Sequence, residues 1–251
     1  MKIVVIGGTG LIGSRLTAKL KTLNHEVVVA SPSKGVNAYT GEGLDKAMRH
    51  AQVVVDLTDS PSNEDDVSMD FFTCVGQNLI DAGSASDHPH HITLSIVGVD
   101  RLQSCGYFKA KLKQEQIVKN AGIPYTIVRT THFFESTATI IDQSTNGNEV
   151  RIAPAAYQPI AADEVAEILK ELTLGQPKNQ TVEIAGPEKK PQYDFLKEFM
   201  EITGDYRKIY RDVHALFFGI VLNDETLVPG PGPRLGKITF SDWLATQPSK
   251  N

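Results

Sequence analysis

The stretch that decides the fold opens the chain, where Lys2-Ile3-Val4-Val5-Ile6 runs directly into Gly7-Gly8-Thr9-Gly10-Leu11-Ile12-Gly13. The first five residues are mostly β-branched and apolar, as expected of a strand buried on both faces of a parallel sheet. The residues that follow the glycines recur at helical spacing. A glycine-rich turn between a buried strand and an amphipathic helix predicts a dinucleotide-binding unit.

Within this loop we expect Gly7 to permit a tight turn, Gly10 to let the backbone approach a pyrophosphate, and Gly13 to let the helix pack close to the strand. The N–H groups of the helix N-terminus would bind the phosphates. The predicted cofactor contacts of the loop are Gly7, Thr9, Gly10, Leu11, Ile12 and Gly13. The spacing is G-x-x-G-x-x-G, whereas ordinary dehydrogenases have G-x-G-x-x-G. A strand-turn-helix without a ligand is the alternative interpretation.

Along the rest of the chain, short β-branched runs alternate with longer amphipathic segments. This alternation predicts an α/β fold with a doubly wound parallel Rossmann sheet. Further strands are expected at Glu26–Ala30, Val53–Asp56, Ile92–Ser95, Tyr125–Arg129 and Thr181–Ile184, with weaker support for an edge strand near Val36–Thr40. Helices are expected at Leu11–Leu23, Gly43–His50, Asp65–Ala82, Tyr107–Ala121 and Asp163–Leu172.

The pattern changes after Arg129, because Thr130–Gln158 shows no clear periodicity and Pro229–Pro233 can be neither helix nor central strand. We expect residues 1–130 to form an NAD(P)-binding Rossmann core. Residues 131–251 would supply the remaining core elements and a small, discontinuous C-terminal substrate-capping region, within a single structural unit.

The composition is that of an ordinary globular protein: 251 residues, 41% hydrophobic and 22% charged, with a net charge of −5. The negative charge argues against nucleic-acid and anionic-membrane partners. No apolar run is long enough to span a bilayer, and the first residues lack the features of a signal peptide. Two cysteines do not make a disulfide framework. We therefore expect a cytoplasmic protein with a small-molecule substrate.

The residues after the second expected strand bear on the choice of dinucleotide. An acidic residue there would bind the adenosine ribose of NAD and repel the 2′-phosphate of NADP. This chain instead has Ser31, Ser33 and Lys34, which can donate to a phosphate and supply positive charge, although a solvated turn would use the same residues. We predict NADP in preference to NAD. Thr58 and Ser60, after the third strand, are further expected cofactor contacts.

Three polar residues downstream point to proton chemistry. Ser95 ends an expected strand, and Tyr107 and Lys111 are four residues apart on one face of the following helix. A close ammonium and an oxidised nicotinamide would both favour the phenolate, so Tyr107 could exchange a proton with a substrate oxygen held by Ser95. A solvated helix face carrying the same two residues is the alternative.

These residues resemble the short-chain dehydrogenase/reductase superfamily, and most closely its atypical NmrA-like, NAD(P)-binding branch. The resemblance rests on Gly7–Gly13, Leu94–Asp100, Tyr107–Lys111 with Gln114-Glu115, Gly122–Arg129, Pro159–Ala166 and Thr239–Leu244. It implies that Ser95, Tyr107 and Lys111 are catalytic, with Lys111 also contacting the cofactor. It further implies that His132, Phe133 and Phe134 line the substrate pocket. Asp56–Pro61 departs from the Asn-Ala-Gly segment of typical members.

The preferred interpretation is an NADP-dependent oxidoreductase that transfers hydride to or from a small carbonyl, quinone or alcohol. The alternative is an NmrA-like regulator that binds NADP(H), performs little catalysis and reports to a protein partner; a homodimer is also left open. A sugar-nucleotide epimerase ranks last because it would need a larger C-terminal domain. His88, His90 and His91 crowd one turn, but no further ligand completes a metal site, so none is expected.

Overall fold

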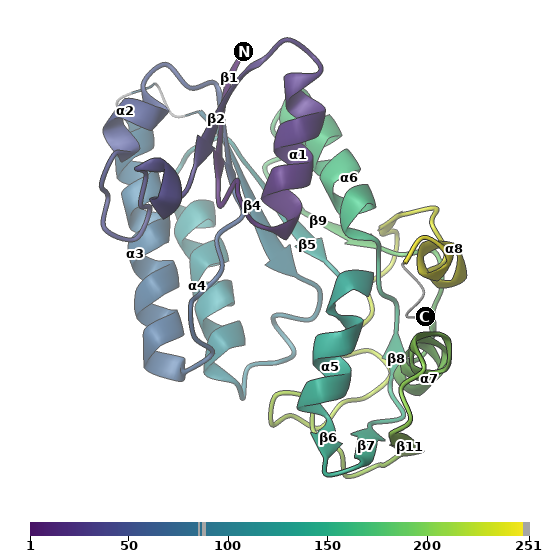
Figure 1. Cartoon of the computed structure of the whole chain (residues 1–251). Helices are drawn as coiled ribbons and strands as arrows, with labels where there is room; N and C mark the ends of the chain where they lie inside the picture. Colours follow the sequence, from purple (N-terminus) through teal and green to yellow (C-terminus); the bar gives the residue numbers. More distant parts are fainter. Residues whose placement is uncertain (85, 87–88, 248–251) are drawn as a thin grey trace. The chain divides into compact units, whose positions relative to one another are not determined.

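The computed structural model describes residues 1–84, 86 and 89–247 of the chain (Figure 1). Its centre is a seven-stranded parallel sheet with strand order β12-β9-β5-β4-β3-β1-β2. The strands are β1 (Lys2–Ile6), β2 (Glu26–Ala30), β3 (Val53–Asp56), β4 (His90–Ile96), β5 (Tyr125–Thr130), β9 (Thr181–Ala185) and β12 (Arg234–Leu235). β1 and β3 are almost completely buried, which agrees with their aliphatic runs Ile3–Ile6 and Val53–Val55.

The strand order reverses between β1 and β3. β1 pairs with β2 on one side and with β3 on the other, so the chain leaves the carboxyl ends of β1 and β3 in opposite directions. In open α/β sheets, ligands bind in the crevice at such a switch point. The glycine loop follows β1 and the segment 57–60 follows β3, so both predicted cofactor segments begin at this position.

The chain divides into two compact units, the first comprising Met1–Arg129 and Val165–Val182. The helices of this unit are α1 (Leu11–Lys21), α2 (Leu44–Met48), α3 (Asp65–Ser84), α4 (Gly106–Asn120) and most of α6 (Ala162–Leu174). Figure 1 shows α3 and α4 side by side on one face of the sheet and α1 and α6 on the other. Lys19 of α1 forms an ion pair of 3.5 Å with Glu167 of α6.

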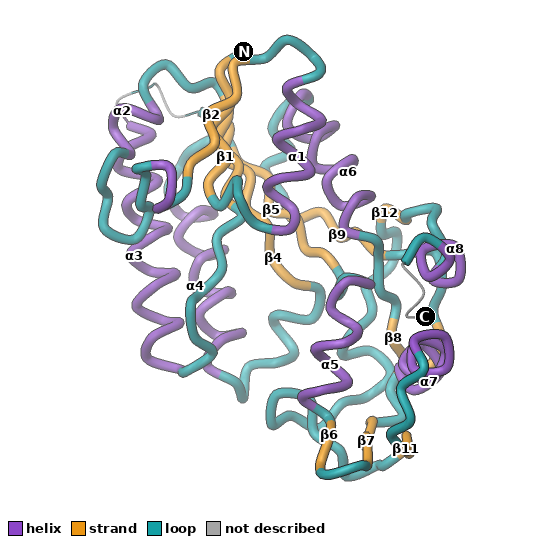
Figure 2. The backbone as a smooth tube through the Cα atoms, in the orientation of Figure 1, coloured by secondary structure: helices purple, strands orange, loops and turns teal. Residues whose placement is uncertain are grey.

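The second unit comprises Thr130–Glu164 and Glu183–Asn251. Its helices are α5 (Thr137–Gln143), α7 (Gln192–Thr203) and α8 (Phe240–Ala245). Two small sheets pair β8 (Ala156–Tyr157) with β10 (Lys190–Pro191), and β7 (Glu149–Ile152) with β6 (Thr145–Asn146) and β11 (Lys208–Arg211). Figure 2 labels β6, β7 and β11 of the second of these sheets. Phe134, Phe195, Phe240 and Trp243 pack ring against ring in its core.

The expected Rossmann fold is confirmed, and the predicted strands agree with the observed ones to within two residues at either end. The expected edge strand near Val36–Thr40 is wrong. A 3-10 turn (Pro32–Lys34) follows β2 instead, and the side chain of Asn37 accepts the backbone N–H of Tyr39, which closes a further turn. The expectation that Thr130–Gln158 is irregular is also wrong, since this stretch forms α5 and three short strands.

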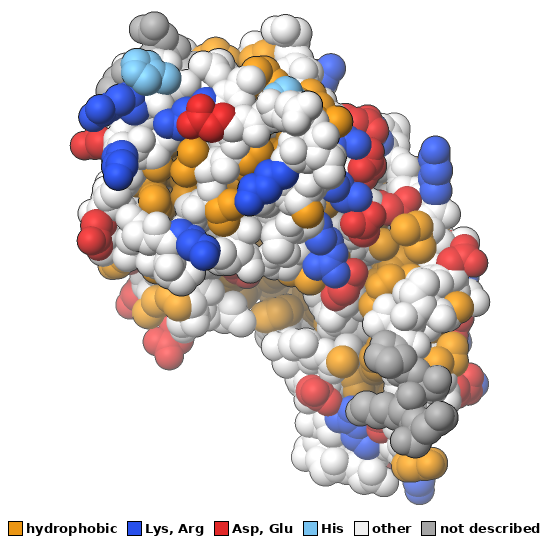
Figure 3. All heavy atoms as spheres, turned by 45° about the horizontal axis from the view of Figure 1, so that its top comes forward, with side chains coloured by type: hydrophobic (Ala, Val, Ile, Leu, Met, Phe, Trp, Pro, Cys, Tyr) orange, Lys and Arg blue, Asp and Glu red, His pale blue; other side chains and the backbone are white. Residues whose placement is uncertain are grey.

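Charged side chains of both signs are interspersed on the face drawn in Figure 3. Among the described residues, no helix combines the length and apolar character needed to cross a membrane.

Two adjacent histidines occupy the start of the central strand β4. His90 is 6% exposed and lies 2.8 Å from the hydroxyl of Thr126, and His91 is also buried. Burial lowers the pKa of His90 to about 4 and also lowers the pKa of His91. Both imidazoles are therefore neutral in the folded chain at neutral pH.

We expect the fold to lose stability as the pH falls from about 6.5 towards 4, because the unfolded chain then binds protons that the buried histidines exclude. For His90 the difference is worth about 3 kcal/mol once the pH is below both pKa values. The measurement is the urea unfolding free energy at neutral and acidic pH for wild type and His90→Gln, whose amide can keep the bond to Thr126. An equal loss in both proteins would contradict the prediction.

Candidate functional site

Three glycines of the loop after β1 meet different steric demands. Gly7 has φ +71°, and a Cβ there would lie 2.7 Å from the carbonyl oxygen of Leu57. A Cβ on Gly13 would overlap the carbonyl oxygen of Gly7 and approach the Cα of Gly8 to 2.7 Å. At Gly10 the one neighbour within 4 Å would be the Gly7 oxygen, at 3.3 Å. Gly7 and Gly13 are thus required by the fold itself, whereas Gly10 leaves an exposed approach for a ligand.

The N-terminus of α1 is suited to an anion. Gly10 is its N-cap and supplies no side chain, the first turn holds no acidic residue, and Thr9 to Leu11 are exposed while Ile12 and Gly13 are buried. The first N–H groups of a helix have no partner within the helix and carry partial positive charge. This geometry fits a pyrophosphate bound by backbone N–H groups.

The segment after β3 packs directly on the glycine loop through the contact between Leu57 and Gly7. Asp56, 1% exposed, accepts the backbone N–H and the hydroxyl of Thr58 at 3.0 and 2.7 Å. The hydroxyl of Ser60 donates to the carbonyl oxygen of Ser62. The two hydroxyls predicted to contact a cofactor therefore form hydrogen bonds within this segment.

The residues after β2 lie at the expected position for the adenosine ribose. The hydroxyls of Ser31 and Ser33 are 3.0 Å apart, and Ser31 is buried. Ser33 and Lys34 are exposed on the 3-10 turn. The two residues predicted to bind a ribose 2′-phosphate, Ser33 and Lys34, are thus accessible to a ligand.

Tyr107 opens α4 and bonds to a residue that the sequence did not single out. Its hydroxyl donates to Oδ1 of Asp59 at 2.8 Å, and its ring packs edge-on against Phe72 of α3. Burial raises the pKa of Tyr107, and the Asp59 carboxylate raises it further. These two effects hold the phenol in its neutral form, in contrast to the phenolate expected beside an oxidised nicotinamide.

Lys111 is buried, and its ammonium group donates hydrogen bonds within the protein. It donates to the carbonyl oxygen of Leu94 at 2.8 Å and to Gln114 Oε1 at 2.7 Å, and lies 4.6 Å from the centre of the Phe72 ring. Gln114 in turn donates to Asp56 Oδ2 at 2.7 Å. Burial lowers the pKa of Lys111, although nearby carboxylates oppose this effect. Lys111 and Gln114 thereby connect α4 to the ends of β3 and β4.

Ser95 forms a hydrogen bond with Glu115, whereas Tyr107 forms one with Asp59. The Ser95 hydroxyl donates to Oε1 of Glu115 at 2.6 Å, and Arg129 donates to both oxygens of the same carboxylate at 2.9 Å. Burial alone would raise the pKa of Glu115, but the bonds from Arg129 and Ser95 outweigh it and lower the pKa. The three predicted catalytic residues thus form hydrogen bonds with different groups: Ser95 with Glu115, Tyr107 with Asp59, and Lys111 with Leu94 and Gln114.

The predicted substrate residues lie in the second unit. Half-buried His132 packs against Phe217 with ring centres 5.2 Å apart, and its apolar surroundings lower its pKa to about 4. Phe133 is partly exposed. Phe134 is 1% exposed and packs edge-on against Phe240, so it belongs to the core of this unit.

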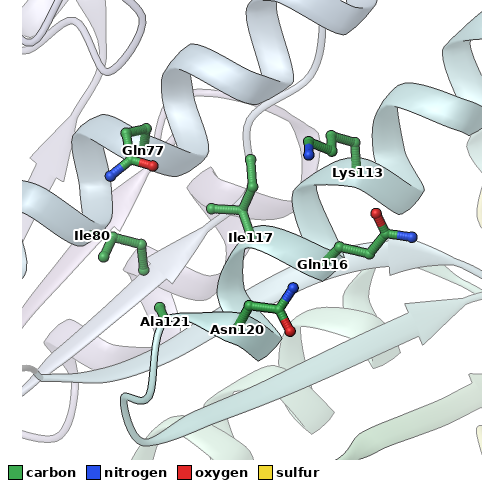
Figure 4. A pocket seen from close by; sticks show the side chains of 7 residues that line it. All are labelled: Gln77, Ile80, Lys113, Gln116, Ile117, Asn120 and Ala121. Carbon is green, nitrogen blue, oxygen red and sulfur yellow. The ribbon is translucent and has the colours of Figure 1, made fainter.

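A separate surface hollow of about 300 Å³ lies on the outer side of α3 and α4 (Figure 4). It is lined by Gln77, Ile80, Lys113, Gln116, Ile117, Asn120 and Ala121, none of which is a predicted site residue. Over the described part of the chain, no group of three or more His, Cys, Asp or Glu side chains could hold a metal ion. His88 lies outside the described residues.

Four polar residues around the site, Asp59, Gln114, Glu115 and Arg129, received no individual role from the sequence. Gln114 and Glu115 are seven and eight residues beyond Tyr107, which places them two turns along the same helix face. That spacing was a usable signal for the two α4 residues. Asp59 carried no such signal, because its contact with Tyr107 spans 48 residues.

The fold and the glycine loop define a protein of the NAD(P)-binding Rossmann class. The chain belongs to the NAD(P)H-binding family, whose model matches residues 7–173. The expected membership of an NAD(P)-binding family is thereby confirmed, whereas the short-chain dehydrogenase/reductase type and the NmrA-like branch stay predictions.

A curated relative is the (4-alkanoyl-5-oxo-2,5-dihydrofuran-3-yl)methyl phosphate reductase of Streptomyces griseus, which is 25% identical over 148 residues. The match covers 54% of this chain and 49% of the relative, so the chain aligns with about half of that protein.

Solved structures share the fold. A dTDP-4-dehydrorhamnose reductase from Bacillus anthracis in complex with NADP superposes with a TM-score of 0.71 at 14% identity, covering 86% of each chain. A UDP-glucuronic acid 4-epimerase from Bacillus cereus in complex with NAD gives 0.65 at 19% identity, covering 97% of this chain and 94% of that one. The low rank given to an epimerase stays a prediction, because likeness at this level of identity shows the fold alone.

Proposed function

We propose that this protein is an NADP-dependent oxidoreductase that reduces a small carbonyl or quinone-type compound. The observation that carries the proposal is the connection between the glycine loop and Tyr107. Gly7 abuts Leu57, and Asp59, two residues further on, accepts the Tyr107 hydroxyl. A neutral phenol beside the expected nicotinamide site can donate a proton to a carbonyl oxygen.

Support for NADP comes from the turn after β2. Ser33 and Lys34 are exposed there, and the turn lacks the acidic side chain that would repel a 2′-phosphate. The backbone N–H groups at the start of α1 would hold the pyrophosphate, and Gly10 leaves room for its approach. When bound, NADPH supplies the hydride.

In this proposal Tyr107 supplies the proton. Lys111 supports the site by tying α4 to the strand ends, and its positive charge favours any negative charge that develops on the phenol oxygen. Reduction is favoured over epimerisation, because an alcohol oxidation must begin with a proton acceptor and Tyr107 is held as a donor.

A regulator that binds NADP(H) is the second candidate. It is favoured by one observation, namely that the side chains of Ser95 and Lys111 are bonded to structural partners. Such a protein would distinguish oxidised from reduced cofactor and gain little from Tyr107.

The test is NADPH oxidation with a panel of quinones, aldehydes and ketones. We expect turnover by wild type and a loss of at least about a hundredfold in kcat for Tyr107→Phe, with NADPH affinity retained, because one general acid contributes about that much. Ser33→Ala with Lys34→Ala should weaken NADPH binding and leave NADH binding unchanged. NADPH binding without Tyr107-dependent turnover would favour the regulator.

A further inference from the structure

Asp59 is not one of the predicted catalytic residues Ser95, Tyr107 and Lys111. It nevertheless contacts the hydroxyl oxygen of Tyr107, the atom that would exchange the proton. Its side chain is exposed at the segment after β3, and its Oδ1 atom accepts the Tyr107 hydroxyl at 2.8 Å. The segment that carries it is held by the bonds from Thr58 to buried Asp56. Asp59 therefore joins the phenol to solvent through one hydrogen bond.

Asp59 is the charged residue that forms a hydrogen bond with the Tyr107 hydroxyl. The neighbouring residues on α3 and α4 make other kinds of contact. The ring of Phe72 on α3 forms a T-shaped contact with Tyr107, and Asp65 of the same helix accepts the backbone N–H of Gly106. On α4, Cys105 is the N-cap, and the ammonium of Lys111 donates to Leu94 and Gln114.

We propose that Asp59 is a catalytic residue that holds Tyr107 as a proton donor and returns a proton to it after each reduction. This inference rests on the proposed function. Asp59 in its carboxylate form accepts the phenol proton in a hydrogen bond and disfavours a second negative charge beside it.

The proton and electron balance is as follows for a carbonyl substrate. Tyr107 donates its proton to the carbonyl oxygen as the C=O π electrons move onto that oxygen, and a bound reduced nicotinamide would supply the hydride of the new C–H bond. The Tyr107 phenolate then takes a proton delivered from solvent through Asp59, whose carboxyl group exchanges protons with water. The sum is carbonyl, NADPH and one proton converted into alcohol and NADP⁺.

The hydrogen bond from Tyr107 to Asp59 favours reduction of a carbonyl over oxidation of an alcohol. Reduction begins with a neutral phenol, which Asp59 favours, whereas oxidation of an alcohol begins with a phenolate, which Asp59 opposes. Removing the charge of Asp59 should therefore move the onset of alcohol oxidation to lower pH and slow the recovery of Tyr107 between reductions.

The experiment needs no substrate. The ultraviolet difference between a protein and its Tyr107→Phe counterpart isolates the ionisation of one phenol across a pH titration. Asp59→Asn keeps a hydrogen-bond acceptor but removes the charge, and we expect it to lower the pKa of Tyr107 by about 1–3 units. Asp66→Asn, which removes another exposed carboxylate nearby in the chain, is the matched control and should leave the titration unchanged.

Because Asp59 is exposed, Asp59→Asn should melt at the wild-type temperature; Asp59→Ala provides a second variant. A Tyr107 pKa that is the same in wild type and both variants, or that stays beyond the range in which they are folded, overturns the proposal. The readout is independent of turnover. A lowered pKa without carbonyl reduction would contradict the proposed function alone, and reduction with an unchanged pKa would contradict the role of Asp59 alone.

Discussion

Gly13→Ala is expected to destabilise the protein by at least about 3 kcal/mol, because overpacking against backbone forces the structure to move. The new Cβ would overlap the Gly7 carbonyl oxygen and approach the Gly8 Cα to 2.7 Å, and neither backbone atom can rotate away. The loop and the first turn of α1 would have to separate, which disturbs the N-terminus proposed to bind the pyrophosphate. The free energy of unfolding in urea measures the effect.

Gly10→Ala is the matched control in the same loop. Its Cβ would meet the Gly7 oxygen at 3.3 Å, and the backbone at Gly10 has φ −75°, which alanine adopts readily. We expect a stability change within about 1 kcal/mol and a loss of NADPH affinity of about tenfold or more. Equal destabilisation by the two substitutions would contradict the steric role of Gly13, because it would show that the backbone there moves to accept a Cβ. Unchanged NADPH affinity in Gly10→Ala would contradict the proposal that the cofactor binds next to Gly10.

Arg129→Met should cost about 3–5 kcal/mol, the usual effect of leaving a buried carboxylate without its partner. The Glu115 side chain is 0% exposed, and Arg129 binds both of its oxygens. Ser95 and Lys119 would remain as donors, but neither replaces a two-pronged guanidinium contact. Urea unfolding free energies again provide the measurement.

Two further variants separate burial from charge. Arg129→Met combined with Glu115→Leu removes the whole pair and should recover part of the loss, because no buried charge is then left unpaired. Arg151→Met breaks exposed ion pairs with Glu149 and Asp212 and should cost less than about 1 kcal/mol. A similar cost for Arg129→Met and Arg151→Met would contradict the importance assigned to the buried network.

The fold was predictable because its signals are local. The aliphatic run of β1, the glycines after it and the helical spacing from Leu11 onward lie within one short segment, and each has a single compatible structure. α7 was not predicted, although its buried Phe195, Leu196 and Met200 recur at helical spacing. The small strands of the second unit have two to four residues and leave too short a pattern to detect.

The site was predictable in its residue types but not in its contacts. The spacing of Tyr107 and Lys111 placed them on one helix face. It could not show that the Lys111 ammonium donates to Leu94 and Gln114. The bond from Ser95 to Glu115 and the bond from Tyr107 to Asp59 join residues 20 and 48 positions apart. Such pairings depend on the packing of whole elements, which periodicity does not encode.

The central claim is that Tyr107 supplies the proton while NADPH supplies hydride to a carbonyl carbon. The most direct test uses NADPH labelled with deuterium at the transferable position of the nicotinamide, with mass spectrometry of the alcohols formed from the aldehyde and ketone panel, because deuterium on the new C–H bond does not exchange with water. We predict deuterium in the product of wild type and a rate of its transfer at least about a hundredfold lower with Tyr107→Phe. Tight binding of labelled NADPH with no transfer to any carbonyl class would contradict the account and leave the regulator as the function.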